Sequence, residues 1–265
     1  MQVVRCFENS NVVHVDGNID PIRDIQTINL ELIFADLETI EKRLDKAKKM
    51  LKADKKYQAE INLLEKIKIA LNNGIVARSI EYNEEEKEIM KDFMLLTNKP
   101  IIYVANISEE QLSNVENDEN VKKVKQYAEK EKAEVIPLCI KIEEELASLE
   151  ENEKKEMLEV LGLKEAGLNT LIKKSYDLLG LMSFLTAGEP EVRAWTIKKG
   201  TKAPNAAGKI HSDIERGFIK AEIISYDDLI KEGSMVKAKE KGIVRQEGKD
   251  YIMQEGDVVL FKFNV

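Results

Sequence analysis

The chain has 265 residues and a formal net charge of −8, with 34% charged and 43% hydrophobic residues. This length allows one large domain or two to three small ones, and the acidic balance argues against binding nucleic acid, DNA in particular, through bulk charge. A local basic patch would not show in that sum. No run of 18 apolar residues and no basic-led signal segment occurs, so we expect a cytoplasmic protein without a membrane partner.

The N-terminal part of the chain predicts a strand and a helical hairpin. Residues 2–7 read as a strand, followed by a polar turn and a second apolar run at 12–15. From about Ile25 apolar residues recur at steps of three and four, and a charged break at 52–56 separates two such seams, the second ending near Gly74. Since neither helix could bury its stripe alone, the seams predict an antiparallel hairpin. The seam positions are Ile33, Leu37, Ile40, Leu44, Ala47 and Leu51, then Tyr57, Ile61, Leu64, Ile67 and Leu71.

The middle of the chain predicts a βαβ unit followed by helices. A helix begins at the N-cap Asn83, with Glu86 at the third helical position, and is expected to run to about Leu96. Short apolar strands separated by an amphipathic helix are typical of a parallel sheet. The remaining predicted elements are strands at 101–105 and 135–139 and helices at 121–132, 142–149, 153–161 and 168–179.

Beyond Leu181 the pattern changes to short strands and turns. Strands are expected at 192–197, 219–224 and 258–263, with one helix at 207–216. These elements predict a small sheet that holds one helix.

Two chain positions carry the candidate binding residues. Asn106, Ile107 and Glu109 directly follow the first strand of the βαβ unit, and Cys139 and Ile140 end the second. Parallel α/β sheets bind ligands outside the carboxyl ends of their strands, so these residues are the candidate site. For Cys139 and Ile140, a plain apolar strand end remains as good an interpretation as direct contact with a ligand.

Other chemistry finds little support in the sequence. No Gly-x-x-x-x-Gly-Lys-Ser/Thr phosphate-binding loop occurs. His14 and His211 are isolated, so no metal site is expected. Cys6 and Cys139 are far apart within apolar runs, which predicts buried free thiols without a catalytic role.

The C-terminal third carries a family resemblance. Residues 185–197, 200–204 and 207–218 resemble the TGS domain of the YchF-type, Obg-related P-loop ATPases. The Asn-x-x-Glu at 106–109 is similar to the form this family has in place of the GTPase Asn-Lys-x-Asp. The resemblance implies a preference for adenine, with Asn106 facing the base, the Ile107 backbone meeting its exocyclic amine, and Glu109 at the altered acidic position. It places Cys139 and Ile140 where related GTPases cover the base.

The resemblance extends over essentially the whole chain and implies its architecture. It implies an α/β fold: a partial P-loop NTPase parallel sheet, an inserted antiparallel helical hairpin (coiled coil), and a C-terminal ubiquitin-like β-grasp domain. We expect the domains to be a nucleotide-domain remnant strand and loop at 1–24, the hairpin at 25–80, the base-recognition half of the nucleotide domain at 81–180, and the TGS domain at 181–265.

The implied function is that of an ATP-binding, ribosome-associated regulatory ATPase. The family uses ATP with Mg²⁺, but the phosphate-binding and Mg²⁺-binding elements are not in this sequence. We therefore expect an N-terminally truncated member that binds ATP weakly or not at all and does not hydrolyse it alone. The alternatives are a non-catalytic module that contacts ribosomal RNA or protein, and a nonfunctional remnant. An incomplete sheet is also expected to expose an apolar edge and face and so to favour self-association.

Overall fold

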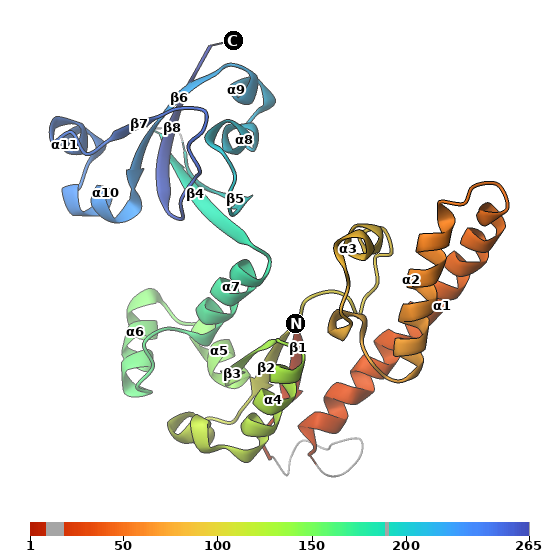
Figure 1. The fold of residues 1–265 in the computed structure, drawn as a ribbon. Coiled ribbons are helices and arrows are strands. Elements are labelled where there is room, and N and C mark those ends of the chain that lie inside the picture. Colours follow the sequence, from red (N-terminus) through yellow and green to blue (C-terminus); the bar gives the residue numbers. More distant parts are fainter. Residues whose placement is uncertain (9–18, 189–190, 265) are drawn as a thin grey trace. The chain divides into compact units, whose positions relative to one another are not determined.

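The computed structural model describes residues 1–8, 19–188 and 191–264. It divides into two compact units, Met1–Leu171 and Ile172–Val265, each of which is described by itself (Figure 1). The apolar run expected at 12–15, His14 included, lies outside the described residues, as do Glu189 and Pro190. Among the described helices, none combines the length and apolar character needed to cross a bilayer.

The first unit contains a three-stranded parallel sheet. Its order is β1 (Gln2–Arg5), β2 (Ile102–Asn106) and β3 (Glu134–Leu138), and α4 (Glu119–Lys130) connects β2 to β3. The central strand β2 is buried at its first four positions, which is why it reads as a continuous apolar run. The predicted βαβ unit and α/β fold are confirmed, and all three strands end at one edge of the sheet.

The two faces of this sheet are packed differently. One face joins Val4, Tyr103 and Ala105 to buried residues of α4 and of α5 (Ile140–Ala147). On the other face Ile102, Val104, Ile136 and Leu138 cluster with Leu171, and none of the five is more than 8% exposed. The expectation of an open apolar face is therefore wrong for these residues, because packing at Leu171 closes it. Val3 in β1 is 50% exposed.

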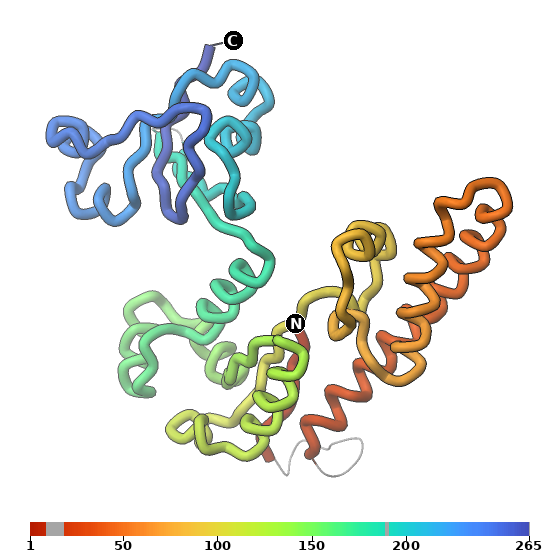
Figure 2. Tube along the Cα trace, viewed as in Figure 1, coloured from red at the N-terminus to blue at the C-terminus, as the bar shows by residue number. Residues whose placement is uncertain are grey.

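The hairpin consists of α1 (Pro21–Leu51) and α2 (Tyr57–Asn72), and Figure 2 shows the chain running out along one helix and back along the other. The helix α1 begins earlier than predicted, because Asp20 accepts hydrogen bonds from the N–H groups of Ile22 and Arg23 and Pro21 occupies the first turn. Its first turns belong to the sheet rather than to the hairpin, since Ile25 packs into the core beneath β1. Farther along, the predicted seam residues pack together: Ile33, Ile40, Leu44, Ala47, Ile61, Leu64, Ile67 and Leu71.

The segment after the hairpin differs from its prediction in length. The predicted capping box between Asn83 and Glu86 is present, but α3 (Glu84–Met90) stops well short of Leu96. The chain leaves the helix there because Phe93 and Leu95 turn into the hairpin core. The other elements of this unit are η1 (Ala77–Ser79), η2 (Glu110–Asn117), α6 (Glu151–Val160) and the start of α7 (Gly167–Leu178).

The second unit is built on a five-stranded sheet of order β5-β4-β8-β6-β7. The single helix expected at 207–216 is wrong: the chain forms two short helices, because His211 has an extended backbone and its side chain accepts a hydrogen bond from the Asp213 N–H as the cap of the second helix. The elements of this unit are β4 (Leu181–Ala187), β5 (Val192–Lys198), α8 (Ala203–Gly208), α9 (Ser212–Arg216), β6 (Phe218–Ser225), α10 (Tyr226–Glu232), α11 (Met235–Glu240), β7 (Arg245–Glu247) and β8 (Asp257–Phe263).

Candidate functional site

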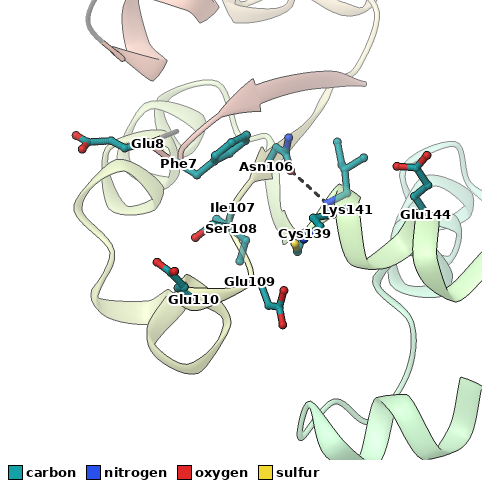
Figure 3. Close-up of a pocket in the computed structure, with 11 residues that line it drawn as sticks. Phe7, Glu8, Asn106, Ile107, Ser108, Glu109, Glu110, Cys139, Lys141 and Glu144 are labelled. Carbon is teal, nitrogen blue, oxygen red and sulfur yellow. Dashed lines mark hydrogen bonds between the residues drawn. The ribbon is translucent and has the colours of Figure 1, made fainter. Parts of the chain in front are cut away.

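The carboxyl ends of β1, β2 and β3 border a pocket of about 690 Å³ (Figure 3). Parallel strands in register place their carboxyl ends side by side, which is where α/β proteins bind ligands. All five residues singled out in the sequence line this pocket: Asn106, Ile107, Glu109, Cys139 and Ile140. The structure therefore brings the two strand ends together around one cavity.

Asn106 links β2 to the start of α5. Its carbonyl oxygen accepts a hydrogen bond from the Cys6 N–H at 2.8 Å, which holds it beside β1. Its Oδ1 accepts from the Ile140 N–H at 3.2 Å, the contact drawn in Figure 3. Cys139, the N-cap residue of α5, makes no capping bond with its own side chain, so the Asn106 amide replaces it. With Oδ1 engaged, the Nδ2 amino group is the hydrogen-bond donor that Asn106 can offer to a ligand.

Ile107 presents its main chain rather than its side chain. The side chain is 2% exposed and packs into the core, while its N–H donates to the Leu138 carbonyl at 3.0 Å. This bond extends the β2–β3 pairing by one residue, and Ile107 lines the pocket although its side chain is buried. A carbonyl in that position can accept a hydrogen bond from a ligand amine.

The chain then turns sharply into η2. The Ser108 N–H donates to Gln111 Oε1 at 2.7 Å, and Gln111 in turn bonds the Cys6 carbonyl at 3.1 Å and Asp118 Oδ2 at 2.6 Å. Gln111 thus ties the loop after β2 to the end of β1. Glu109 lies within this turn as an exposed residue directly before η2.

The two residues from the β3 end play unequal parts. The Cys139 side chain is 4% exposed, whereas Ile140 is 38% exposed in the first turn of α5. Ile140 is therefore the residue whose apolar surface can lie against a flat ligand, and Cys139 is a buried part of the lining.

Six further residues line the pocket and were missed in the sequence. Phe7 and Glu8 come two and three residues after the end of β1, as Ser108 and Glu109 do after β2, so the same search at the carboxyl ends of strands could have found them. Lys141 and Glu144 lie one turn apart on α5. They line the pocket because of the way α5 packs against the sheet, which the sequence pattern does not predict. The full set is Phe7, Glu8, Ser108, Glu110, Lys141 and Glu144. With Glu109, the lining holds four glutamates and one lysine, so it carries negative charge at neutral pH.

Cys6 lies behind this edge and is not a nucleophile. Burial, with a smaller contribution from the charges of Asp118 and Asp24, raises the pKa of its thiol to about 12. The thiol thus keeps its proton at neutral pH, and the thiolate is the reactive form.

The side chains do not fit Mg²⁺ or a triphosphate. Among the described residues, no group of three or more His, Cys, Asp or Glu side chains is arranged to hold a metal ion. Phosphate oxygens call for cationic or amide donors, and the pocket offers Lys141 among four carboxylates. The donor at Nδ2 of Asn106, the Ile107 carbonyl and the Ile140 side chain fit an uncharged heterocycle instead.

The fold and the site together define an α/β protein with a ligand pocket at the carboxyl edge of a parallel sheet. Residues 181–264 match the family model YchF-GTPase_C, described as a protein of unknown function (DUF933). The chain is 54% identical over 264 residues to "Ribosome-binding ATPase YchF" of Bacillus subtilis (strain 168), covering 99% of this chain and 72% of that protein. A protein of the same name from Escherichia coli O157:H7 is 45% identical over equal shares.

A solved structure agrees with these sequence relatives. The Schizosaccharomyces pombe YchF GTPase aligns with 98% of this chain and 71% of its own, with a TM-score of 0.81 and 35% identity. A GTP-binding protein from Pyrococcus horikoshii OT3, 21% identical with a TM-score of 0.58, shares the fold. The chain belongs to the YchF family.

Proposed function

We propose that this chain recognises the adenine base of ATP at the carboxyl edge of its sheet and associates with the ribosome, as the names of its relatives indicate for them. The observation that supports the first part is the convergence of Asn106, Ile107 and Ile140 on one pocket. We also propose that Glu109 and Cys139 are part of this base-binding site.

The polar groups of the pocket suit adenine better than guanine. The 6-amino group of adenine is a donor, whereas guanine carries an acceptor oxygen at that position. The Ile107 carbonyl can accept a hydrogen bond from the 6-amino group of adenine, whereas it would repel the oxygen of guanine. Nδ2 of Asn106 donates to a ring nitrogen, and Ile140 covers the face of the base. The names of the relatives include both an ATPase and a GTPase, so the base preference is the property to measure.

The charge of the pocket determines how much the phosphates contribute. Four glutamates outnumber Lys141 in the lining, so a triphosphate is repelled where the base is held. We therefore propose that these 265 residues bind adenosine at least as tightly as ATP, and do not hydrolyse ATP by themselves. The non-catalytic alternative, a ribosome-binding module without turnover, is compatible with the same pocket.

The test is calorimetric titration of the chain with adenosine, ATP and guanosine. We expect millimolar binding of adenosine, ATP no tighter than adenosine, and guanosine weaker by at least about tenfold. Tighter binding of ATP than of adenosine, or equal binding of both nucleosides, would contradict the proposal.

A matched pair of variants separates recognition from folding. Asn106→Asp keeps an oxygen for the Ile140 N–H but removes the Nδ2 donor, whereas Asn106→Ala removes both. Because adenosine is uncharged, the added carboxylate does not repel it. We expect both variants to lose adenosine binding, with only the alanine variant also losing stability, read from urea unfolding. Retained binding in Asn106→Asp would exclude the side chain as the base contact.

The remaining parts of the family architecture belong to the proposal as well. We propose that 181–265 is a TGS domain, and that 1–24 and 81–180 are parts of the nucleotide domain, with the hairpin inserted at 25–80. We also propose that the protein acts in the cytoplasm. Mg²⁺ accompanies ATP, in this proposal, only in longer members of the family. Co-sedimentation with ribosomes tests the partner directly.

A further inference from the structure

The hairpin carries its unbalanced positive charge at one end. Between residues 46 and 58 there are six lysines and a single acidic residue, Asp54, in a chain whose net charge is −8. We call residues 46–58 the hairpin tip. It comprises the last turns of α1, the connection, and the start of α2. In Figure 1 this end of the hairpin points away from the three-stranded sheet of the same unit.

The basic residues on the rest of the hairpin pair with carboxylates of this unit. On the rest of the hairpin, Lys42 pairs with Glu38, Lys66 with Glu86, Lys68 with Glu41, and Arg43 with Glu60, at 2.5 to 2.9 Å. Over 21–45 and 59–72 acidic residues outnumber basic ones, so this part of the hairpin offers a polyanion no net positive charge.

Four of the six tip lysines have no such partner. Lys48 pairs with Glu65 and Lys56 with Asp54. The other four are exposed and form no ion pair with any described residue: Lys46, Lys49, Lys52 and Lys55. Their charges are held close together without compensation, which costs repulsion that a bound polyanion would relieve.

A groove beside the tip adds an aromatic surface to this charge. It has a volume of about 540 Å³ and is lined by residues that include Lys46, Met50 and Tyr57. The Tyr57 ring is half-buried, with the Lys56 ammonium 5.4 Å from its centre, and Met50 is 41% exposed. Lys42 and Lys46 are four residues apart, so they lie on one face of α1, and both line the groove.

We propose that the hairpin tip is an RNA-binding surface, in which the four unpaired lysines contact phosphates and Tyr57 offers its ring to a base. Proteins that bind single-stranded nucleic acid combine a cationic path for the backbone with aromatic rings for the bases. Lysines on flexible stems serve as point charges for phosphates. This inference gives a partner class for the ribosome association proposed above, and it does not depend on the nucleotide pocket.

The test is fluorescence anisotropy of a labelled 20-nucleotide single-stranded RNA of mixed sequence, titrated with the chain at several salt concentrations. The test variant replaces Lys46, Lys49, Lys52 and Lys55 by Gln. The control variant makes the same change in net charge at exposed lysines elsewhere, Lys123, Lys231, Lys237 and Lys249. Glutamine keeps helix propensity, and far-UV circular dichroism checks that the hairpin is intact.

We expect the tip variant to bind the RNA at least about tenfold more weakly, and its plot of log affinity against log salt to flatten by roughly 3, since each phosphate contact on a single strand contributes about 0.7 to the slope. The control variant should stay within about twofold of the unmodified chain. Equal losses in both variants, or an unchanged slope in the tip variant, would overturn the inference.

Two further measurements separate this inference from its alternatives. Polyglutamate of equal charge replaces the RNA in a parallel titration, and binding of polyglutamate as tight as that of RNA would indicate an acidic protein partner and overturn the RNA assignment. Ribosome co-sedimentation of the unmodified chain without binding of the RNA probe would overturn the inference and leave the proposed ribosome association standing.

Discussion

At the scale of single residues, Cys6 shows how burial controls chemistry near the candidate site. Its thiol is 1% exposed, and its pKa is raised from 9.0 to about 12. This shift lowers the thiolate fraction at pH 8 about a thousandfold. We predict that iodoacetamide alkylates Cys6 at least about a hundredfold more slowly in the folded protein than in urea, measured by mass spectrometry of its peptide. Equal rates in the two states would contradict the burial of this thiol.

The raised pKa of Cys6 also makes the free energy of unfolding depend on pH. The unfolded chain loses the Cys6 proton above pH 9, whereas the folded protein keeps it up to about pH 12. The contribution of Cys6 to the free energy of unfolding is therefore fully present below pH 9 and is lost as the pH rises from 9 to 12. A Cys6→Ala variant should lose stability less steeply across that range than the unmodified chain.

At the scale of elements, buried polar contacts fasten the hairpin to the sheet. Arg78 before α3 pairs with Glu131 after α4 at 2.8 Å, with both side chains under 9% exposed, and Arg78 also bonds Asn29 of α1 at 3.2 Å. Asp36 of α1 accepts hydrogen bonds from the Leu96 and Thr97 N–H groups, both at 2.7 Å. These bonds fix α1 to segments far away in the chain.

We predict that Asp36→Ala lowers the free energy of unfolding of the first unit by about 2–4 kcal/mol. The reason is that two N–H groups and the Thr97 hydroxyl lose a charged acceptor in a site where Asp36 is 2% exposed. Urea unfolding followed by far-UV circular dichroism measures the change.

The matched control is Asp45→Ala, an exposed position on the same helix, which should change stability by less than about 0.5 kcal/mol. If the two variants are equally stable, the Asp36 contacts do not hold the hairpin.

At the scale of the whole molecule, the two units have separate hydrophobic cores. The first has its hairpin and sheet clusters, and the second packs Phe184, Phe218 and Phe261 around α8. The single tryptophan, Trp195, belongs to the second unit, where its indole N–H donates to Thr186 at 2.9 Å. The longest helices, α1 and α2, belong to the first.

We predict that the units unfold separately in urea. Tryptophan fluorescence reports on the second unit alone, and the circular dichroism at 222 nm is dominated by the helices of the first. The two signals should therefore give different midpoints. Coincident curves would indicate one cooperative molecule.

Local features of the sequence determined much of this protein. The hairpin seams through Ile40 and Leu64, the capping box at Asn83 and the apolar strand β2 all depend on neighbours in the chain, through helical periodicity, capping and burial. The position of the candidate site could also be predicted, because the carboxyl end of a parallel strand is a general binding position and Asn106 ends such a strand.

The tertiary structure alone decided what depends on distant partners. Helix α3 ends at Met90 although the sequence pattern continues, because Phe93 and Leu95 turn into the hairpin core and the next two residues give their N–H groups to Asp36, sixty residues earlier. Phe7 joins the pocket only because β1 pairs with β2. The contact of Asn106 with the first turn of α5 arises in the same way. Such contacts join segments that are far apart in the sequence. They form only when the sheet and its helices pack together, so local sequence patterns do not reveal them.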